Sequence, residues 1–406
     1  MRSGLERGPQ TWYVYLMLGF FGFVLNLQGN IVPLLKSELG LSYRTVGLHA
    51  SAVAAGLMST GLSGTPLLRR LGRRRAMWLG ALGLALGTLL LCAARVPQWT
   101  IAACALIGAV GGLVPVVVST ALADIHGERR DVAYAEANAA SYLFSILGPL
   151  GIGAALALGV DWRYALVAGA ALGLLVVAWF RRVRLPDAQP LAQQASARLA
   201  RAYWLYWLTL GLGVGIEYGM LLWAPEFLER VAGLRRSAAA AGAASFMLAM
   251  VVGRIAGGRL LRSVSAPRLL RASLWVVVAG FIVYAVLGDA QRVGPTMAAV
   301  SAIVGLFLAG LGVAPLYPLT LALAVRAAGP LSSLAAARTT LASGGAILLM
   351  PTLLGGAADE VGLRGAVWIV PALAVAALAA VAAADGRVAG TRFPAAVFRG
   401  RLRRAR

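Results

Sequence analysis

Residues 203–223 read YWLYWLTLGLGVGIEYGMLLW, an apolar run that contains one carboxylate, Glu217. At about 1.5 Å of rise per residue, Glu217 lies roughly 20 Å into a helix over this run, near mid-bilayer if the helix spans a membrane. A charge at that depth costs a few kcal/mol, so residues of this kind typically face a bundle interior or a water-filled path. Glu217 is therefore a candidate for a proton or substrate route. The alternative is a protonated Glu217 that only hydrogen-bonds a neighbouring helix.

The composition indicates a membrane protein. Of 406 residues, 60% are hydrophobic and 13% are charged, and the mean hydropathy is +0.80, which lies outside the range of soluble domains. The formal net charge of +22 would suggest a nucleic-acid partner in a soluble protein. Here the arginines fall in short clusters between apolar runs, so the positive charge indicates membrane topology, and we expect no nucleic-acid partner.

The sequence shows no signature of an enzyme or of a metal site. Cys92 and Cys104 lie in apolar runs without CxxC or Cys/His spacing, which indicates neither a disulfide framework nor a metal site. There is no Walker lysine loop, no HExxH motif and no carboxylate-rich prenyl-diphosphate motif. We therefore expect no catalytic residue, no cofactor and no metal. The first apolar run, residues 11–35, is too long for the core of a signal peptide and is interpreted as a spanning helix.

Apolar runs of about 20 residues, bounded by charged or turn residues, predict twelve transmembrane helices. They cover residues 12–35, 45–68, 76–94, 99–123, 132–158, 162–181, 202–225, 238–260, 269–288, 296–325, 334–356 and 364–384. The predicted fold class is thus an all-α polytopic membrane protein, with twelve helices in two six-helix bundles.

The positions of the basic residues predict the orientation, because Lys and Arg concentrate in cytoplasmic loops. If both termini are cytoplasmic, the inner segments hold 27 of the 37 basic residues, the outer segments hold nine, and Arg254 lies within a helix. This ratio favours a multi-pass protein of the cytoplasmic membrane, the inner membrane of the cell, with both termini inside.

A polar connection between helices six and seven divides the chain into two halves. The two halves share a weak sequence similarity in two arginine-rich turns, GTPLLRRLGRRR at 64–75 and GGRLLRSVSAPR at 257–268. This similarity favours two parallel repeats. The predicted units are an N-terminal bundle (1–181), a cytoplasmic linker (182–201), a C-terminal bundle (202–385) and a basic cytoplasmic tail (386–406). The tail is interpreted as a disordered or lipid-surface arm rather than a domain, since basic residues are attracted to anionic lipid.

Together, the twelve helices, the cytoplasmic termini and Gly72-Arg73-Arg74-Arg75 resemble the major facilitator superfamily (MFS) of secondary transporters. The resemblance covers nearly the whole chain. The tetrapeptide is similar to the end of the loop signature of that superfamily, but Leu68 and Arg69 stand where its Asp is expected. The second loop also lacks the Asp, with Leu261 and Arg262 there. The charge-pairing role of that Asp in holding a gate state is therefore not carried over. Arg73 and Arg74 are interpreted as topology anchors, with a gating role as the alternative.

The predicted fifth helix contains a second, partial resemblance. The run GPLGIG at 148–153 is similar to part of the glycine-proline signature of MFS antiporters. Phe144 and Ile152 replace two glycines of the fuller signature. Efflux by antiport is one interpretation. The other is close helix packing at the glycines and a bend at Pro149.

In the first half, polar side chains at mid-helix depth are candidates for solute binding. Asn26 and Asn30 are four residues apart and share a helix face, and Asn138 and Tyr142 do the same in the fifth helix. The first-half candidates are Asn26, Gln28, Asn30, Asn138 and Tyr142. Interhelical hydrogen bonding is the competing role for the amides of the first helix. We interpret Glu136, with Asp124 and Arg129, as interfacial ion pairing, with gating as the minority alternative.

In the second half, aromatic, methionine and hydroxyl side chains near Glu217 are further candidates, although packing is the commoner role of aromatic and methionine stripes. They are Tyr218, Trp223, Phe246, Met250, Tyr317 and Ser343. Arg254 is expected to pair with a carboxylate or with carbonyl groups near the inner mouth, as a gating residue. The run from Gly310 to Pro318 contains too many glycines and prolines for a uniform helix, which favours a place along the transport path.

The predicted function is a secondary active transporter that moves a small organic solute by alternating access. Proton coupling at Glu217 is the hypothesis, since desolvation favours the protonated carboxyl. Because the first half has no midplane arginine, we expect a neutral or cationic solute. Drug or metabolite efflux, uncoupled facilitation and a non-transporting receptor or partner subunit remain alternatives. The expected partners are a small-molecule substrate, protons and membrane lipids, and we expect a monomer.

Overall fold

The computed structural model describes residues 6–186 and 199–390, and these residues form helices and short connections. The predicted linker lies largely outside the described residues, as does most of the predicted basic tail. In the first half the helices are α1 (Pro9–Asn26), α2 (Gln28–Leu39), α3 (Tyr43–Leu71), α4 (Arg73–Ala93), α5 (Pro97–Gly111), α6 (Leu113–His126), η1 (Gly127–Arg129), α7 (Arg130–Ala157) and α8 (Arg163–Trp179).

The second half continues with an equivalent set of long and broken helices. They are α9 (Arg201–Arg230), α10 (Arg236–Gly242), α11 (Ala244–Leu260), α12 (Ala266–Ile282), η2 (Val283–Leu287), α13 (Ala290–Val293), α14 (Pro295–Val313), α15 (Leu316–Ala327), η3 (Gly329–Leu331), α16 (Ser332–Ala366) and α17 (Ile369–Gly390). Gly362 interrupts the helical backbone of α16 with a φ of 73°.

The helices confirm the predicted all-α membrane fold. Within the described residues, ten helical segments are long and apolar enough to cross a bilayer. The shorter apolar α8 and the 29-residue α3 correspond to the other two predicted runs. The run from Gly310 to Pro318 is indeed broken, because α14 ends at Val313 and α15 begins at Leu316.

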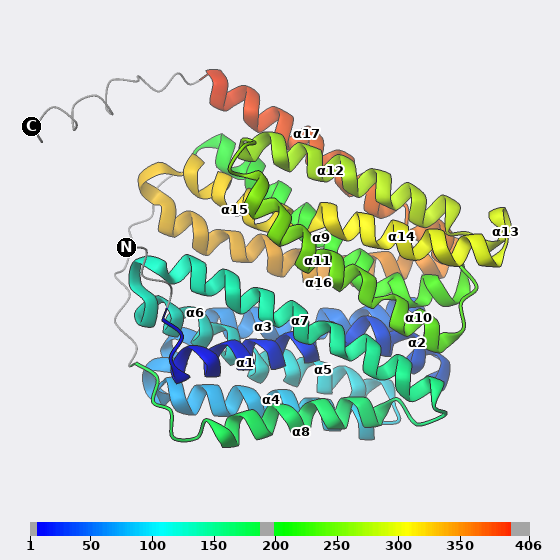
Figure 1. Ribbon diagram of the computed structural model, residues 1–406, viewed down its shortest axis with the longest axis horizontal. Helices are drawn as coiled ribbons and strands as arrows, with labels where there is room; N and C mark the ends of the chain where they lie inside the picture. Colours follow the sequence, from blue (N-terminus) through cyan, green and yellow to red (C-terminus); the bar gives the residue numbers. More distant parts are fainter. Residues whose placement is uncertain (1–5, 187–198, 391–406) are drawn as a thin grey trace, which may run out of the picture.

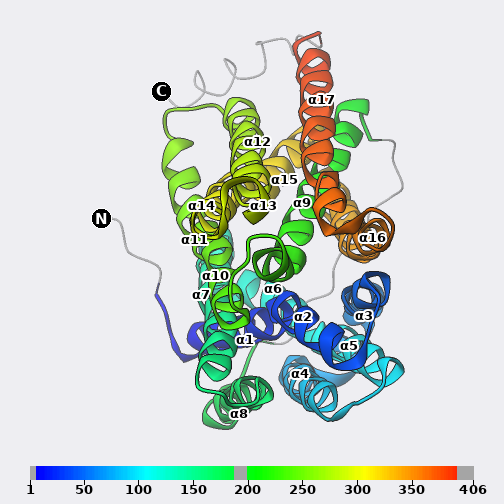
Figure 2. The ribbon, with the colours of Figure 1, turned by 90° about the vertical axis from the view of Figure 1, so that its right-hand side faces the viewer.

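The helices gather into two groups whose axes run roughly along the long axis of the molecule. α1 to α8 lie together in the lower part of Figure 1, and α9 to α17 lie above them. Figure 2, turned by 90°, shows the two groups nearly end-on. Contacts between the groups are made by α3 with α16, by α7 with α10 and α11, and by α2 with α9. A solute path between the halves would therefore be bordered by these helices.

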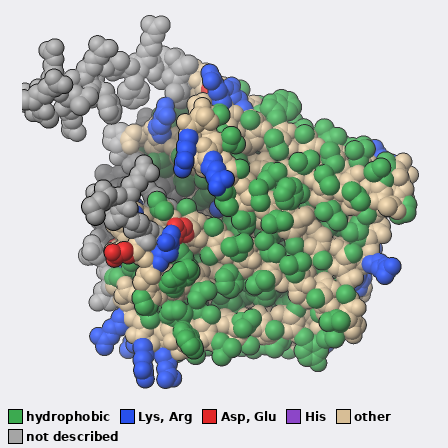
Figure 3. Space-filling model, viewed as in Figure 1, with side chains coloured by type: hydrophobic (Ala, Val, Ile, Leu, Met, Phe, Trp, Pro, Cys, Tyr) green, Lys and Arg blue, Asp and Glu red, His purple; other side chains and the backbone are tan. Residues whose placement is uncertain are grey.

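We call the end of the molecule where α1 begins and α17 ends the proximal end, and the end where α2 leads into α3 the distal end. They lie on the left and right of Figure 1, respectively. Figure 3 shows hydrophobic side chains over the middle of one face, with Lys and Arg mostly toward its ends. This distribution is typical of a protein surrounded by lipid, because the hydrocarbon core accepts apolar side chains and excludes charges.

Glycines bring the two halves into backbone contact toward the distal end. A Cβ atom at Gly47 of α3 would lie 2.5 Å from the carbonyl oxygen of Pro351 on α16. Gly29 of α2 is similarly close to the Leu221 carbonyl oxygen of α9, and Gly355 of α16 to the Tyr43 carbonyl oxygen of α3. The absence of side chains at these positions therefore allows the halves to close against each other.

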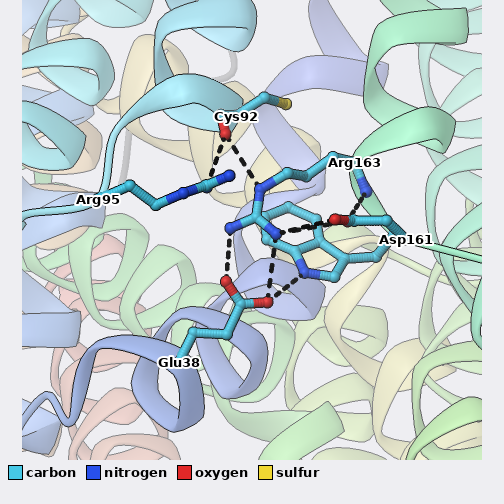
Figure 4. A network of polar contacts seen from close by, with 6 residues as sticks. Glu38, Cys92, Arg95, Asp161 and Arg163 are labelled. Atoms are coloured by element: carbon cyan, nitrogen blue, oxygen red, sulfur yellow. Dashed lines mark hydrogen bonds and ion pairs between the residues drawn. The ribbon is translucent and has the colours of Figure 1, made fainter.

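A polar network fixes the distal ends of helices within the first half (Figure 4). Arg163 donates hydrogen bonds to both carboxylate oxygens of Glu38, and the Trp162 Nε1 donates one of 2.8 Å to Glu38 Oε1. Arg163 also donates to Asp161, and both Arg163 and Arg95 donate to the Cys92 carbonyl oxygen. This network joins the end of α2 to the α4–α5 and α7–α8 connections, so these segments are expected to move as a unit.

Candidate functional site

The centre of the candidate site is a chain of three polar side chains that crosses between the halves. The Tyr142 hydroxyl on α7 donates a hydrogen bond of 3.1 Å to Glu217 Oε1 on α9. Arg254 Nη2 on α11 donates one of 2.7 Å to the same hydroxyl, and the Arg254 guanidinium carbon lies 4.2 Å from the centroid of the Tyr142 ring. Tyr142 therefore links a carboxylate and a guanidinium that both belong to the other half.

The local helices explain why these side chains meet. Glu217 lies midway along α9, which continues through Pro225 to Arg230, and Arg254 lies near the proximal end of α11. α7 packs against α11, and the Tyr142 hydroxyl contacts both residues. The sequence on either side of each residue is apolar, so Glu217, Tyr142 and Arg254 are one another's main polar partners. Ionisable side chains at membrane depth are typically paired in this way.

The protein does not fully enclose these three side chains. Glu217, Tyr142 and Arg254 are each partly exposed. Arg254 Nε is buried and has no hydrogen-bond partner. A guanidinium has five N–H donors, so Arg254 keeps donor capacity for a further acceptor.

Two tyrosines complete the surroundings of Glu217. Tyr218 follows it on α9, and Tyr317 lies on α15 just after the break at Pro315. Tyr218 interacts electrostatically with Glu217, and Tyr317 interacts with both Glu217 and Arg254. Both rings also pack on a small apolar cluster of Leu210, Val214 and Ala342. The site thus combines charge, hydroxyl groups and an apolar wall.

The amides predicted from the sequence lie in different surroundings. Asn26 Nδ2 donates 2.9 Å hydrogen bonds to the Gly22 carbonyl oxygen and to Ser145 Oγ on α7, which matches the interhelical alternative. Asn138 Nδ2 donates to the Tyr134 carbonyl oxygen within α7. The side chain of Gln28 lies outside the described residues.

Asn30 lies further toward the distal end, at the boundary between the halves. It is buried, its Oδ1 has no hydrogen-bond partner, and it borders a small, partly open space together with Pro225 of α9 and Arg236 of α10. Unlike Tyr142, Asn30 has no described hydrogen bond to Glu217. Its role as a solute contact remains a prediction.

Three further candidates are enclosed in this conformation. Trp223, Phe246 and Met250 are at most 1% exposed, so they are packed in the protein interior and are closed to a solute here. Ser343 on α16 is partly exposed, and its hydroxyl donates a 3.1 Å hydrogen bond to the Thr340 carbonyl oxygen. These four positions remain predictions as solute contacts.

Of the predicted gating residues, those at the proximal end pair with the first half and with the beginning of the predicted linker. Buried Arg73 donates a 2.6 Å hydrogen bond to Asp124 and a 2.7 Å bond to the Pro186 carbonyl oxygen. Arg74 donates to the Arg181 carbonyl oxygen.

Glu136 is held by Arg7 in a bidentate pair, with N–O distances of 2.7 and 2.9 Å, and by Tyr15 at 3.0 Å. Glu136 thus forms an ion pair with Arg7, which the sequence did not predict. The Arg7–Glu136 hydrogen bonds and charge raise the pKa of Arg7 further. These contacts fix the start of α1 to α7.

Sequence reasoning missed a polar cluster that joins the halves at the distal end. Glu226 of α9 is fully buried, with Arg230 Nε 2.5 Å and Lys36 Nζ 3.9 Å from its Oε1. Lys36 belongs to α2 of the first half and also lies 4.0 Å from the centroid of the Tyr43 ring. The available signal was a Glu close behind an apolar run, at LLWAPE.

A second distal contact joins the beginning of α3 to α16. Both carboxylate oxygens of Asp359 on α16 accept hydrogen bonds of 2.8 Å, one from the backbone N–H of Tyr43 and one from that of Arg44. These N–H groups belong to the first turn of α3, where helical backbone donors lack intrahelical partners. Asp359 therefore caps a helix of the opposite half.

Comparisons with known proteins agree with this architecture. The family model described as Major Facilitator Superfamily matches residues 14–330. An uncharacterized MFS-type transporter of Yersinia pestis is 24% identical over 344 residues, which is 83% of this chain and 86% of the relative.

Solved transporter structures share the fold at low sequence identity. The nucleoside transporter NupG, crystallised as a point variant, matches with a TM-score of 0.74 and 13% identity over 92% of this chain and 99% of that chain. A peptide transporter in complex with sulfate matches with a TM-score of 0.74 and 17% identity over 94% and 96%. An inward-facing, occupied bacterial homologue of the human lysosomal transporter Spinster matches with a TM-score of 0.68 and 18% identity over 94% and 98%.

Proposed function

Because this chain belongs to the major facilitator superfamily and is a secondary transporter, we propose that it moves a small organic solute across the cytoplasmic membrane and couples this movement to protons at Glu217. The observation that carries the proposal is the hydrogen bond between Tyr142 of the first half and Glu217 of the second. A protonation event at Glu217 would act directly on a contact between the two halves.

The chemistry of the bond explains how coupling would operate. An ionised Glu217 accepts a charge-assisted hydrogen bond from Tyr142, and such bonds are about twice as strong as bonds between neutral groups. A protonated Glu217 is neutral and holds Tyr142 less firmly. Loading of a proton therefore weakens one link between the halves, and release of the proton restores it.

We propose that the proximal end is cytoplasmic, on the basis of the arginine distribution in the sequence. In this orientation the closed distal end, with its glycine contacts and the Lys36–Glu226 pair, is the outer end. Glu217 would then exchange protons with the cytoplasmic side in this conformation, and with the outside once the distal contacts separate. The protein is proposed to act as a monomer surrounded by lipid.

The test begins with a thermal-shift screen of the purified protein against metabolite and drug libraries, since a ligand that binds the native state raises its apparent stability. A solute found in this way is then measured in proteoliposomes with an imposed pH gradient. The wild type is expected to transport faster with the gradient, and Glu217→Gln is expected to lose this dependence. Glu229→Gln, on the same helix near its distal end, is the matched control.

Each other outcome points to a different function. An unchanged response to the pH gradient in Glu217→Gln would remove the role of Glu217. Wild-type flux that ignores the gradient would indicate an uncoupled facilitator. Neither stabilisation nor flux with any solute would indicate a receptor or partner subunit.

A further inference from the structure

We propose that the solute is a small organic monoanion and that Arg254 binds its carboxylate when Glu217 carries a proton. This inference rests on the proposed coupling at Glu217 and names the class of solute for the same site. It replaces the expectation of a neutral or cationic solute, which followed from the lack of a midplane arginine in the first half. The structure brings the arginine of α11 to the interface instead.

The arrangement of the two charges carries the proposal. Glu217 and Arg254 are both described, and they form no direct ion pair; the Tyr142 hydroxyl lies between them, accepting from Arg254 and donating to Glu217. Among the described residues, the neighbouring titratable groups are Tyr218 and Tyr317, with Tyr134 of α7 beside Tyr317. Glu217 is thus the carboxylate that balances Arg254 in the described site, and it does so through a neutral bridge.

Protonation of Glu217 leaves the guanidinium without this counter-charge. A net charge at membrane depth is costly unless a partner compensates it. A solute carboxylate supplies the missing charge, so the empty site with ionised Glu217 and the loaded site with a proton and a monoanion are both neutral. Both states can therefore reorient across the membrane, whereas a half-loaded site is disfavoured. The expected stoichiometry is one proton for each monoanion.

The donors for the solute are already present. Arg254 uses Nη2 for Tyr142, while its buried Nε has no hydrogen-bond partner. A guanidinium edge binds a carboxylate through two parallel N–H groups. The Tyr142 ring against which Arg254 stacks fixes the plane of the guanidinium.

The surroundings also indicate the remainder of the solute. The rings of Tyr218 and Tyr317 and the apolar cluster of Leu210, Val214 and Ala342 form a wall beside the charges. Pockets of this kind use apolar surface for most of the contact and a few polar groups for orientation. A carboxylate with a small alkyl or aromatic group fits this combination, and a dianion would leave an uncompensated negative charge.

The test compares carboxylates with their amides, which have similar shape but no charge. Purified full-length protein is mixed with acetate, lactate or benzoate, and separately with acetamide, lactamide or benzamide, at pH 6 and pH 8. The thermal unfolding midpoint reports binding, and a pH indicator in weak buffer reports proton uptake. At least one carboxylate is expected to raise the midpoint, more strongly at pH 6, with one proton taken up for each molecule bound. The amides are expected to have no effect.

Variants assign the effect to individual residues. Arg254→Gln is expected to lose the carboxylate-dependent shift, and Arg254→Lys to retain part of it. Arg259→Gln, an exposed arginine on the same helix, is expected to behave as the wild type. Glu217→Gln, which resembles the protonated state, is expected to bind the carboxylate equally at both pH values without proton uptake. Size-exclusion profiles verify that each variant is folded.

The monoanion proposal is overturned if no carboxylate in the panel stabilises the wild type, if the amides bind as well, or if Arg254→Gln retains the shift. Amide binding with proton uptake would leave the coupling at Glu217 in place while removing the solute class. If carboxylate binding through Arg254 keeps its pH dependence in Glu217→Gln, the solute class stands and the coupling at Glu217 is removed.

Discussion

The Tyr142 hydroxyl lies 3.1 Å from Glu217 Oε1, and this distance joins a helix of the first half to the middle of a membrane span in the second. The bond can exist only while α7 and α9 keep their present separation. It therefore makes the ionisation of Glu217 sensitive to the relative position of the halves, and the position of the halves sensitive to the proton.

Replacement of Tyr142 by Phe tests this link. The variant removes the donor to Glu217 and the acceptor for Arg254 but keeps the ring on which Arg254 stacks. A hydrogen bond to a charged group contributes about 1.5–3 kcal/mol, so we expect roughly a tenfold or larger loss of proton-driven flux in proteoliposomes. Tyr164→Phe, at an exposed position of α8, is the control. Equal flux in both variants would show that the bridge has no part in coupling.

We expect Asp359 to stabilise the closed distal end. It caps the first turn of α3 from the opposite half, and loss of an N-terminal cap costs about 1 kcal/mol, or roughly a fivefold change in a two-state equilibrium. Asp359→Ala is therefore expected to increase the population in which the distal ends are separated. Double electron–electron resonance would measure it between spin labels at Arg44→Cys and Glu360→Cys, with Cys92 and Cys104 replaced by Ala.

The wild-type background with the same labels provides the reference for this measurement. Both samples carry Arg44→Cys and Glu360→Cys, so they differ only at residue 359. A distance distribution that is identical with and without Asp359 would show that the cap does not hold the distal end closed.

Much of the fold was predictable because its signals are local. Apolar run length identified the spanning helices, and the glycines and prolines between Gly310 and Pro318 identified the break between α14 and α15. Glu217, Tyr142 and Arg254 were predicted as site residues because each is a polar side chain within an apolar run. Their roles as a proton site, a solute contact and a gate remain predictions, while their proximity is a feature of the structure.

Partners that depend on tertiary packing were not predictable from the same signals. Asp359 and Tyr43 are 316 residues apart in sequence, and no periodicity relates them. Hydropathy also fails to separate one buried helix face from another, which is why Phe246 and Met250 were chosen as solute contacts although they are fully buried in this conformation. The burial of Glu226 beside Lys36 likewise follows from how α2 and α9 cross.

Gly47 provides a steric test of the same closure. A Cβ atom there would lie 2.5 Å from the Pro351 carbonyl oxygen, so Gly47→Ala must push α3 and α16 apart. Overpacking typically costs 1–3 kcal/mol, and we expect roughly a tenfold shift toward the separated distal end, measured with the same label pair. Gly61→Ala on α3 meets no atom within 4 Å and is the matched control. Equal distance distributions in the two variants would contradict close packing at Gly47.

We expect Glu38 to make a pH-dependent contribution to the stability of the folded protein. Burial raises the pKa of Glu38, but the hydrogen bonds from Arg163 and Trp162 and the Arg163 charge outweigh it, so the pKa lies below its usual value. A carboxyl with a lowered pKa in the folded state stabilises the protein above its unfolded pKa and loses that effect as the pH falls through the folded value. Glu38→Gln is therefore expected to unfold several degrees below the wild type at pH 7. The two midpoints should converge below about pH 4.

Thermal unfolding in detergent across pH 3.5–8 measures this convergence, and Glu6→Gln, a carboxylate preceding α1, is the control for a general change in net charge. In Glu38→Gln, Arg163 keeps Asp161 and the Cys92 carbonyl oxygen as acceptors but loses its charged contact with α2. A gap between wild type and Glu38→Gln that is constant over the whole range would mean that the Glu38–Arg163 pair contributes through packing rather than through charge.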